Sequence, residues 1–183
     1  MARVNPKGIA AIAAAGLTLC SGALLTFLGK WEGEGQNKVY ADLLANSIPT
    51  VCKGLTHWTT DTPIIVGEVW SDEKCKREES QALAAVQSNL IFCFDVKNPP
   101  PQSVFDMATS HAWNVGYLKT CGSQAMQAWQ LGLWAVGCQR LALSDSGRIV
   151  WAYSNGKFVR GLYNRRTDEW KGCSAGIQPS LGK

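Results

Sequence analysis

Hydrophobic residues are most concentrated at the start of the chain. Residues 8–29 contain no charged side chain, and the basic residues Arg3 and Lys7 precede them. A single α-helix of these 22 residues would be about 33 Å long, which is enough to cross the hydrocarbon core of a bilayer. Thirteen of the 22 are Ala, Gly, Ser or Thr, and eight are Ile, Leu or Phe. The pattern therefore predicts an N-terminal hydrophobic helix that a membrane would hold weakly.

Three interpretations of this segment are open. A cleaved signal peptide fits the basic start, but no convincing small-x-small cleavage site precedes residue 31, and the apolar run continues to residue 29. A lipoprotein signal would use Cys20, but Leu19 stands where a small residue is required. An uncleaved anchor would keep its amino end in the cytoplasm, because basic residues favour that side. We favour the anchor, and expect residues 1–29 to form it and residues 30–183 to form the folded domain.

The hydrophobic spacing after residue 30 predicts short strands followed by longer helices. Residues 38–60 combine Val, Tyr, Ile and Thr with Gly and Asn-Ser breaks, which indicates a small sheet. Ser71 is a good helix N-cap, and apolar residues at helical spacing after it predict a helix over residues 72–93. Two more helices are predicted over residues 102–116 and 123–141. The expected fold class is α+β, mostly helical with a small antiparallel sheet.

Composition narrows the class of function. The chain has 183 residues, of which 46% are apolar, so it is long enough for one domain with a core and one appendage. Charged residues make up 17% and the net charge is +4, a balance that suits an anionic polymer but does not by itself identify a partner. Because no arginine-rich tract or nucleic-acid motif is present, we expect no nucleic-acid partner. We expect a monomer.

The cysteines indicate an oxidising compartment. There are seven in the chain, six of them after residue 30, and no pair has the Cys-x-x-Cys spacing. With only two histidines as well, no metal site and no cofactor are expected. Six cysteines allow 15 pairings, among which the sequence does not choose. Three disulfides are expected, with Cys20 left over.

The stretch from Trp31 to Thr56 carries the candidate chemistry. Cleaving a glycosidic bond requires one carboxylic acid to protonate the leaving oxygen and a second carboxylate to activate water or attack the sugar. Glu32 and Asp42 supply such a pair, and the Thr50 hydroxyl is suited to orient a water or the sugar. The acid must keep its proton near neutral pH, which apolar neighbours such as Trp31 favour.

The order of these residues resembles the catalytic region of the tailed-phage lysozymes, endolysins of the glycoside hydrolase class. The shared features are Glu-Gly at residues 32–33, Tyr-x-Asp at 40–42 and Pro-Thr-Val-Cys at 49–52. Further matches are Trp-Asn-Val-Gly at 113–116 and Gly-Leu-Tyr-Asn-Arg-Arg-Thr-Asp-Glu at 161–169. The resemblance covers residues 31–173. It implies a two-lobed lysozyme fold that hydrolyses the β-1,4 bond between N-acetylmuramic acid and N-acetylglucosamine in bacterial peptidoglycan, causing lysis of the host.

The resemblance also implies roles for individual residues. Glu32 is the expected general acid, with Glu34 as a rival; Trp31 favours Glu32, because the family acid follows a large apolar residue. Asp42, with Thr50, would position the attacking water or stabilise the sugar cation.

Several residues outside the catalytic stretch have more than one possible role. One of the two arginines at 165–166 would pair with the catalytic glutamate, although a helix pair between Arg165 and Glu169 has comparable weight. Asn114 would contact the glycan or cap its own backbone. His111 is expected to be structural.

The resemblance extends to the N-terminal segment, because some phage endolysins carry a signal-arrest-release segment that is exported uncleaved and later leaves the membrane. It implies that residues 8–29 first hold the enzyme at the host inner membrane, with the catalytic domain in the periplasm, and then release it. A further hypothesis is that the freed Cys20 thiol attacks a disulfide of the domain, with Cys52 as a partner. The alternative is that Cys20 is only a small apolar residue.

Two other functions remain open from the sequence. The spacings, nine residues between Glu32 and Asp42 and seven between Asp42 and Thr50, are longer than the family pattern. They leave room for a catalytically inactive, membrane-tethered module that binds glycan. A lytic transglycosylase is the other alternative, because that reaction needs one glutamate and no second acid.

Overall fold

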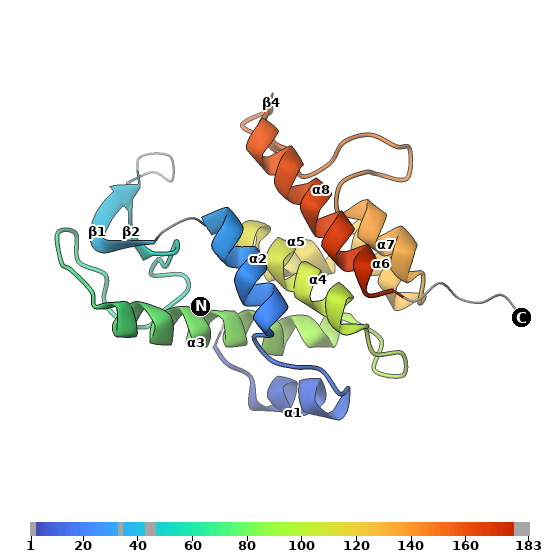
Figure 1. Cartoon of the computed structure of the whole chain (residues 1–183), viewed down its shortest axis with the longest axis horizontal. Helices are drawn as coiled ribbons and strands as arrows, with labels where there is room; N and C mark the ends of the chain where they lie inside the picture. Colours follow the sequence, from blue (N-terminus) through green and yellow to red (C-terminus); the bar gives the residue numbers. More distant parts are fainter. Residues whose placement is uncertain (1–2, 33–34, 43–46, 178–183) are drawn as a thin grey trace, which may run out of the picture.

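The computed structural model describes residues 3–32, 35–42 and 47–177. A small sheet-bearing lobe and a larger helical lobe lie at opposite ends of the long helix α3 (Asp72–Leu90), which runs along both (Figure 1). The expected class, α+β with two lobes and mostly helical, is confirmed. The predicted helix over residues 72–93 is confirmed too, as α3 followed by the 3-10 turn η2 (Ile91–Cys93). Ser71 caps α3, accepting a hydrogen bond of 3.2 Å from the backbone nitrogen of Lys74.

The small lobe is built around a two-stranded antiparallel hairpin. Strand β1 (Gln36–Asp42) pairs with β2 (Ile48–Cys52), so that Tyr40 faces Thr50 and Asp42 faces Ile48. The register shifts between Gln36 and Tyr40. Apolar side chains beneath the hairpin form the core of this lobe: Val39, Val51, Leu55 and Trp70 are all buried. This core fixes the hairpin against the first turns of α3.

The helical lobe is organised around α4 (Gln102–Val115), in which nine consecutive residues, 104–112, are buried. Around it lie α5 (Tyr117–Cys121), α6 (Gln124–Gln130), α7 (Trp134–Arg140) and α8 (Arg160–Ala175). A short hairpin of β3 (Tyr153–Ser154) and β4 (Lys157–Phe158) precedes α8.

The prediction of one helix over residues 123–141 was wrong. The chain breaks between α6 and α7 at Gly132, whose φ of 74° is unfavourable for residues with a side chain. The break folds α7 back, so that Gly137 lies against the indole of Trp129.

The N-terminal segment is folded onto the domain as two helices. Helices α1 (Pro6–Ala14) and α2 (Gly22–Glu32) are separated by a turn in which Gly16 and Cys20 have φ values of 68° and 48°. The apolar residues 8–29 are thus divided between two helices instead of forming a single one. Within the described ranges, none of the helices has both the length and the apolar content to cross a membrane.

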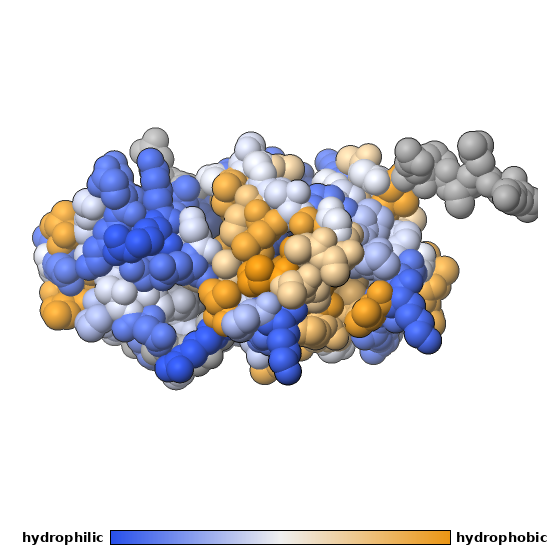
Figure 2. Space-filling model, turned by 90° about the horizontal axis from the view of Figure 1, so that it is seen from below, coloured by the Kyte–Doolittle hydropathy of each residue, from blue (hydrophilic) through white to orange (hydrophobic). Residues whose placement is uncertain are grey.

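Buried apolar side chains and hydrogen bonds hold this segment in place. Ile12, Leu24 and Leu28 are buried. In the turn, the Cys20 backbone nitrogen donates to Gln87 Oε1 at 2.8 Å, and the Ser21 hydroxyl donates to Asp106 at 2.7 Å. Helix α1 lies along α3 and η2, on the face seen from below in Figure 2, where apolar surface gathers at the centre.

Three disulfides connect elements that are distant in sequence. They join Cys52 to Cys75, Cys93 to Cys121 and Cys138 to Cys173. Cys20 is the free cysteine and is half-buried. The expectation of three bridges with Cys20 left over is confirmed, and the pairing, which the sequence left open, is now known.

Candidate active site

Helix α2 positions Glu32 by continuing a buried stripe. Leu24, Leu28 and Glu32 are spaced four residues apart, so they project from the same face of the helix. The two leucines are buried, and the Glu32 side chain at the last turn is 20% exposed. The docking of α2 on the domain therefore turns the Glu32 carboxylate inward.

The carboxylate of Glu32 is held by an arginine from the other end of the chain. Arg165 of α8 donates from Nη1 to Glu32 Oε1 at 2.7 Å, and its own side chain is only 5% exposed. The same guanidinium donates from Nε to Glu169 Oε1 at 3.3 Å. The sequence left these two pairings as alternatives, and the structure contains both.

A pocket of about 340 Å³ lies beside Glu32, between the two lobes. Helix α2 contributes Leu25, Leu28 and Glu32, α3 contributes Glu79 and Leu83, α4 contributes Trp113, and Lys53 follows β2 in the small lobe. The lining is thus mixed: aliphatic and indole surface on one part, and carboxylates and amines on another. Such a lining fits a ligand with hydroxyl groups on an apolar ring, because each kind of surface finds a partner.

The two other residues of the predicted triad, Asp42 and Thr50, lie in the hairpin of the small lobe. Asp42 is the last residue of β1, opposite Ile48, and burial followed by the charge of Asp42 raises the pKa of the neighbouring Tyr40. Thr50 is buried, and its hydroxyl donates to the Ile48 carbonyl at 3.0 Å. Both residues therefore lie beside Ile48, at the same end of the hairpin. The rival acid Glu34 lies outside the described residues.

Behind Glu32 lies a buried charged cluster that the sequence showed only in part. Glu169 is fully buried; it accepts from Arg165 and from the Ser110 hydroxyl at 2.7 Å, and lies 3.2 Å from Arg166 Nη1. Arg166 in turn donates to Asn114 Oδ1 at 3.0 Å. Asn114 thus has a role beyond the two weighed from the sequence, as an acceptor for a buried arginine. Sequence reasoning missed Ser110, because serine in a helix carries no signal of a polar partner.

Burial changes the protonation behaviour of this cluster. It raises the pKa of Glu169, against the opposing effect of Arg166, Arg165 and Ser110. Burial also lowers the pKa of Arg166 to about 10, so that this guanidinium is still charged at neutral pH.

His111 is buried next to the two arginines. Burial first, and then the charges of Arg166 and Arg165, hold the pKa of His111 well below its usual range. Its Nδ1 lies 2.8 Å from the Thr120 hydroxyl, and the edge of the Trp151 ring packs on it. His111 is therefore a neutral packing residue, as expected.

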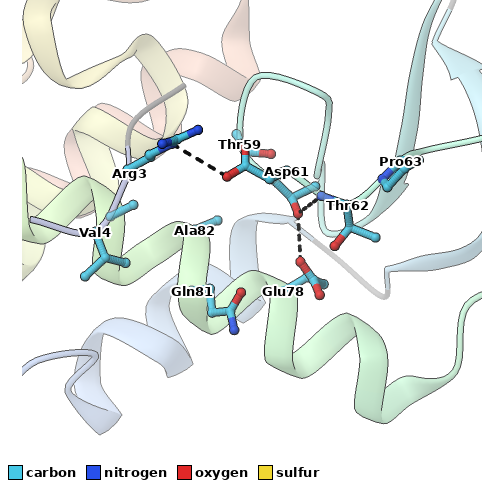
Figure 3. A pocket seen from close by; sticks show the side chains of 11 residues that line it. Arg3, Val4, Thr59, Asp61, Thr62, Pro63, Glu78, Gln81 and Ala82 are labelled. Atoms are coloured by element: carbon cyan, nitrogen blue, oxygen red, sulfur yellow. Dashed lines mark hydrogen bonds and ion pairs between the residues drawn. The ribbon is translucent and has the colours of Figure 1, made fainter.

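A second cavity, of about 570 Å³ and so larger than the interlobe pocket, lies elsewhere, and Glu32, Asp42 and Thr50 do not line it. It is bounded by residues 3–4 of the N-terminal segment, the loop 59–63 and one face of α3 (Figure 3). Arg3 and Asp61 approach each other at 3.8 Å across its mouth, and Glu78 on its floor accepts from the Thr60 hydroxyl at 2.7 Å. Glu32 is absent from its lining but lines the interlobe pocket, so we place the candidate active site at the interlobe pocket. Asp42 and Thr50 are in neither of the two linings.

Comparison with solved structures agrees with this architecture. A mutant of P22 lysozyme has a TM-score of 0.69 at 22% identity, covering 86% of this chain and 99% of its own. The active form of the P1 phage endolysin Lyz gives 0.68 at 22% identity, covering 95% of each chain. The muramidase domain of SpmX from Asticaccaulis excentricus gives 0.67 at 17% identity, covering 87% and 97%. No curated protein matches the chain in sequence.

The family model for phage lysozyme matches residues 29–169, well over half of the chain. The matched region contains Glu32, the hairpin, the interlobe helix α3 and the Arg165–Glu169 cluster. The chain therefore belongs to the phage lysozyme family and is a lysozyme-type glycoside hydrolase.

Proposed function

We propose that this hydrolase is an endolysin that cleaves the β-1,4 bond between N-acetylmuramic acid and N-acetylglucosamine in bacterial peptidoglycan, and so lyses the host cell. The observation that carries the proposal is the placement of Glu32, whose side chain is 20% exposed: its carboxylate is paired at 2.7 Å with a buried arginine and lines a pocket between the two lobes. The muramidase and endolysin names of the similar structures support the substrate class.

In the proposed reaction Glu32 is the general acid. Its carboxyl group would protonate the glycosidic oxygen as the bond to the leaving sugar breaks. Asp42, at the end of the hairpin, would activate the attacking water or stabilise the positive sugar ring. Thr50, on the paired strand β2, would help Asp42 to orient the water or the sugar. Because Thr50 already donates to the Ile48 carbonyl, its hydroxyl would offer the substrate an acceptor.

We further propose that the enzyme begins as a membrane-held precursor at the host inner membrane, with its catalytic domain in the periplasm, and acts as a monomer after release. The docked state of residues 8–29 supports a released form, because Ile12, Leu24 and Leu28 then fill the core of the domain and α2 turns Glu32 inward. A continuous membrane helix over the same residues would withdraw those three side chains. The match of 95% of this chain to the active form of a P1 phage endolysin also supports this state.

The Cys20 thiol belongs to this proposal. In the docked state burial, and next the charge of Asp106, raise the pKa of Cys20, so the reactive thiolate is disfavoured. Exchange would therefore require the segment to be undocked and in water, where the Cys20 thiolate would attack Cys52, form a Cys20–Cys52 bond and release the Cys75 thiolate. The docked structure, with Cys52 bonded to Cys75 and Cys20 free, is the form without this exchange. A Cys20→Ser variant that lyses the host on the normal schedule would eliminate the exchange.

The test is the clearing of outer-membrane-permeabilised Gram-negative cells by the purified, oxidised protein, beside Glu32→Gln, Glu34→Gln and Asp42→Asn variants. We expect the wild type and Glu34→Gln to clear the suspension and Glu32→Gln to be inactive. An inactive wild type under every redox condition would contradict the proposal and favour a glycan-binding module without activity.

The products separate the two enzyme classes. Hydrolysis leaves a reducing N-acetylmuramic acid end, whereas a lytic transglycosylase leaves an anhydro end. Mass spectrometry of the released fragments distinguishes these ends, and full activity of Asp42→Asn together with anhydro products would favour the transglycosylase.

A further inference from the structure

Two glutamates share one arginine at the rear of the site. The Arg165 guanidinium uses Nη1 for Glu32 and Nε for Glu169, and its Nη2 donates to the Ser110 carbonyl at 3.4 Å. All three groups of donors are therefore engaged, which fixes the plane of the guanidinium. Glu169 accepts from Nε, the guanidinium nitrogen bonded to the aliphatic part of the side chain. This contact therefore helps to set the direction in which Nη1 points at Glu32.

The charges of this cluster balance only when both glutamates are counted. Arg165 and Arg166 contribute two positive charges, and Glu32 and Glu169 contribute two negative ones. Three of the four side chains are at most 5% exposed, while Glu32 is 20% exposed. A buried charge without a counter-charge is costly, so the state of one glutamate constrains the other.

This balance has a consequence for an acid that must carry a proton. When Glu32 is protonated, Glu169 is the one remaining anion of the cluster and must neutralise the arginines by itself. Although burial raises the pKa of Glu169, its partners favour the ionised form, because Arg165, Arg166 and the Ser110 hydroxyl all converge on its carboxylate. Without the negative charge at residue 169, both guanidinium groups would act on Glu32 and favour its ionised form.

We propose that Glu169 is a positioning residue for the general acid: its carboxylate fixes Arg165 and neutralises the arginine pair, so that Glu32 can hold a proton at the pH at which the enzyme works. This inference rests on the proposed function of Glu32. Glu169 itself is fully buried and does not touch substrate.

Other titratable groups also lie around Glu32. From α4, His111 faces the two arginines but is neutral, because its pKa is held low. On the pocket side lie Lys53, Lys76 and Glu79, which open to solvent and are screened by it. Lys30, on α2, is engaged by Asp168 at 2.6 Å on the surface. None of these groups bridges to Arg165 among the described contacts.

The experiment compares Glu169→Gln with Glu169→Asp on purified peptidoglycan, measuring kcat and KM across pH. Gln keeps the shape and the hydrogen-bond acceptor but loses the charge, whereas Asp keeps the charge. We expect Glu169→Gln to lower kcat at neutral pH about tenfold with little change in KM, and to move the alkaline limb of the pH profile about one pH unit lower. The direction follows because removing an anion favours loss of the proton from Glu32. Glu169→Asp is expected to restore the wild-type limb.

A second measurement follows the protonation of Glu32 directly and does not depend on activity. The carboxyl carbon of Glu32, followed by NMR during a pH titration, is expected to lose its proton at lower pH in Glu169→Gln than in the wild type. Ser110→Ala, which removes one donor to Glu169, should shift the titration in the same direction by less. It takes the place of Glu169→Gln if that variant does not fold.

The outcomes are distinguishable. A uniform fall in rate at every pH, with an unshifted limb and an unshifted NMR titration, would assign Glu169 a purely structural role and overturn the inference. If Glu32→Gln were as active as the wild type, the proposed function of Glu32 would fail instead, whatever Glu169→Gln did to the titration.

Discussion

Gly8 in α1 lies against the backbone carbonyl of Ser88 in α3 so closely that a Cβ at residue 8 would overlap it. Helix α1 therefore packs on the domain only because residue 8 lacks a side chain. We predict that Gly8→Ala releases α1 from α3, and with it the hydrogen bond from the Asn5 backbone nitrogen to Ser88 Oγ. Hydrogen exchange should show faster exchange over residues 6–14 in the variant.

The matched control for this prediction is Gly22→Ala at the start of α2, where a Cβ would meet no atom within 4 Å. It should leave the exchange of residues 6–14 unchanged. Equal protection of α1 in Gly8→Ala and the wild type would show that the contact with Ser88 does not hold the helix.

A second close approach, between Gly137 and Trp129, packs α7 on α6. A Cβ at residue 137 would run into the indole of Trp129, which is fully buried. We predict that Gly137→Ala lowers the free energy of unfolding by about 2 kcal/mol, because overpacked cores must distort. Urea denaturation measures this. Gly161→Ala in α8, where the space is open, should be neutral or slightly stabilising, and similar losses in both variants would contradict the packing argument.

His111 should make the stability depend on pH in the acidic range. Its pKa in the folded state lies well below the value near 6.5 of the unfolded chain, so below about pH 6.5 the unfolded chain binds a proton that the folded protein does not. Stability therefore falls as the pH falls through this range, by at most about 1.4 kcal/mol per pH unit.

We predict that His111→Asn, which keeps a polar atom near the Thr120 hydroxyl, removes this slope while lowering stability at neutral pH. Denaturation at several pH values between 4 and 8 gives the free energy of unfolding of each protein. The contributions of other titrating groups cancel in the difference between the two. Parallel curves would show that His111 takes up its proton in the folded state as easily as in the unfolded one.

The disulfide between Cys138 and Cys173 ties α7 to α8, the helix that carries Arg165. Closing a loop of 35 residues restricts the unfolded chain. We predict that the double variant Cys138→Ala, Cys173→Ala loses about 3 kcal/mol of unfolding free energy. Thermal unfolding with and without reductant measures it, with the intact protein as the control. A double variant as stable as the oxidised wild type would mean that packing alone holds α8.

The parts of the fold that depend on local sequence could be predicted, and those that depend on distant contacts could not. The start of α3 follows from Ser71 as a cap and from the helical spacing after it. The number of disulfides followed from the cysteine count, but their pairing depends on which helices meet. The break at Gly132 was missed, since glycine within an apolar helical pattern is often tolerated.

The candidate site was predictable in the same uneven way. The order of motifs predicts Glu32, Asp42 and Thr50 as the catalytic residues, and this stays a prediction; the expected arginine partner at 165–166 is confirmed as Arg165, which pairs with Glu32. The sequence could not show that Arg165 contacts Glu32 and Glu169 at once. The two pairings were alternatives of comparable weight, and only the fold shows that Glu32 lies close enough for both. The apolar content of residues 8–29 also does not distinguish a bilayer from a protein core, since both environments accept Ile12 and Leu24 alike.

The family match begins at residue 29, yet the helix that ends in Glu32 begins at Gly22. The boundary of the recognisable module therefore cuts through a secondary-structure element, and leaves Leu24 and Leu28 on the far side of the cut. Replacing the first 28 residues with an unrelated sequence would remove the buried side chains of Ile12, Leu24 and Leu28 from the interior, and most of the helix that orients Glu32. These 28 residues are therefore not interchangeable, and any recombination between related genes must carry them together with the domain that follows.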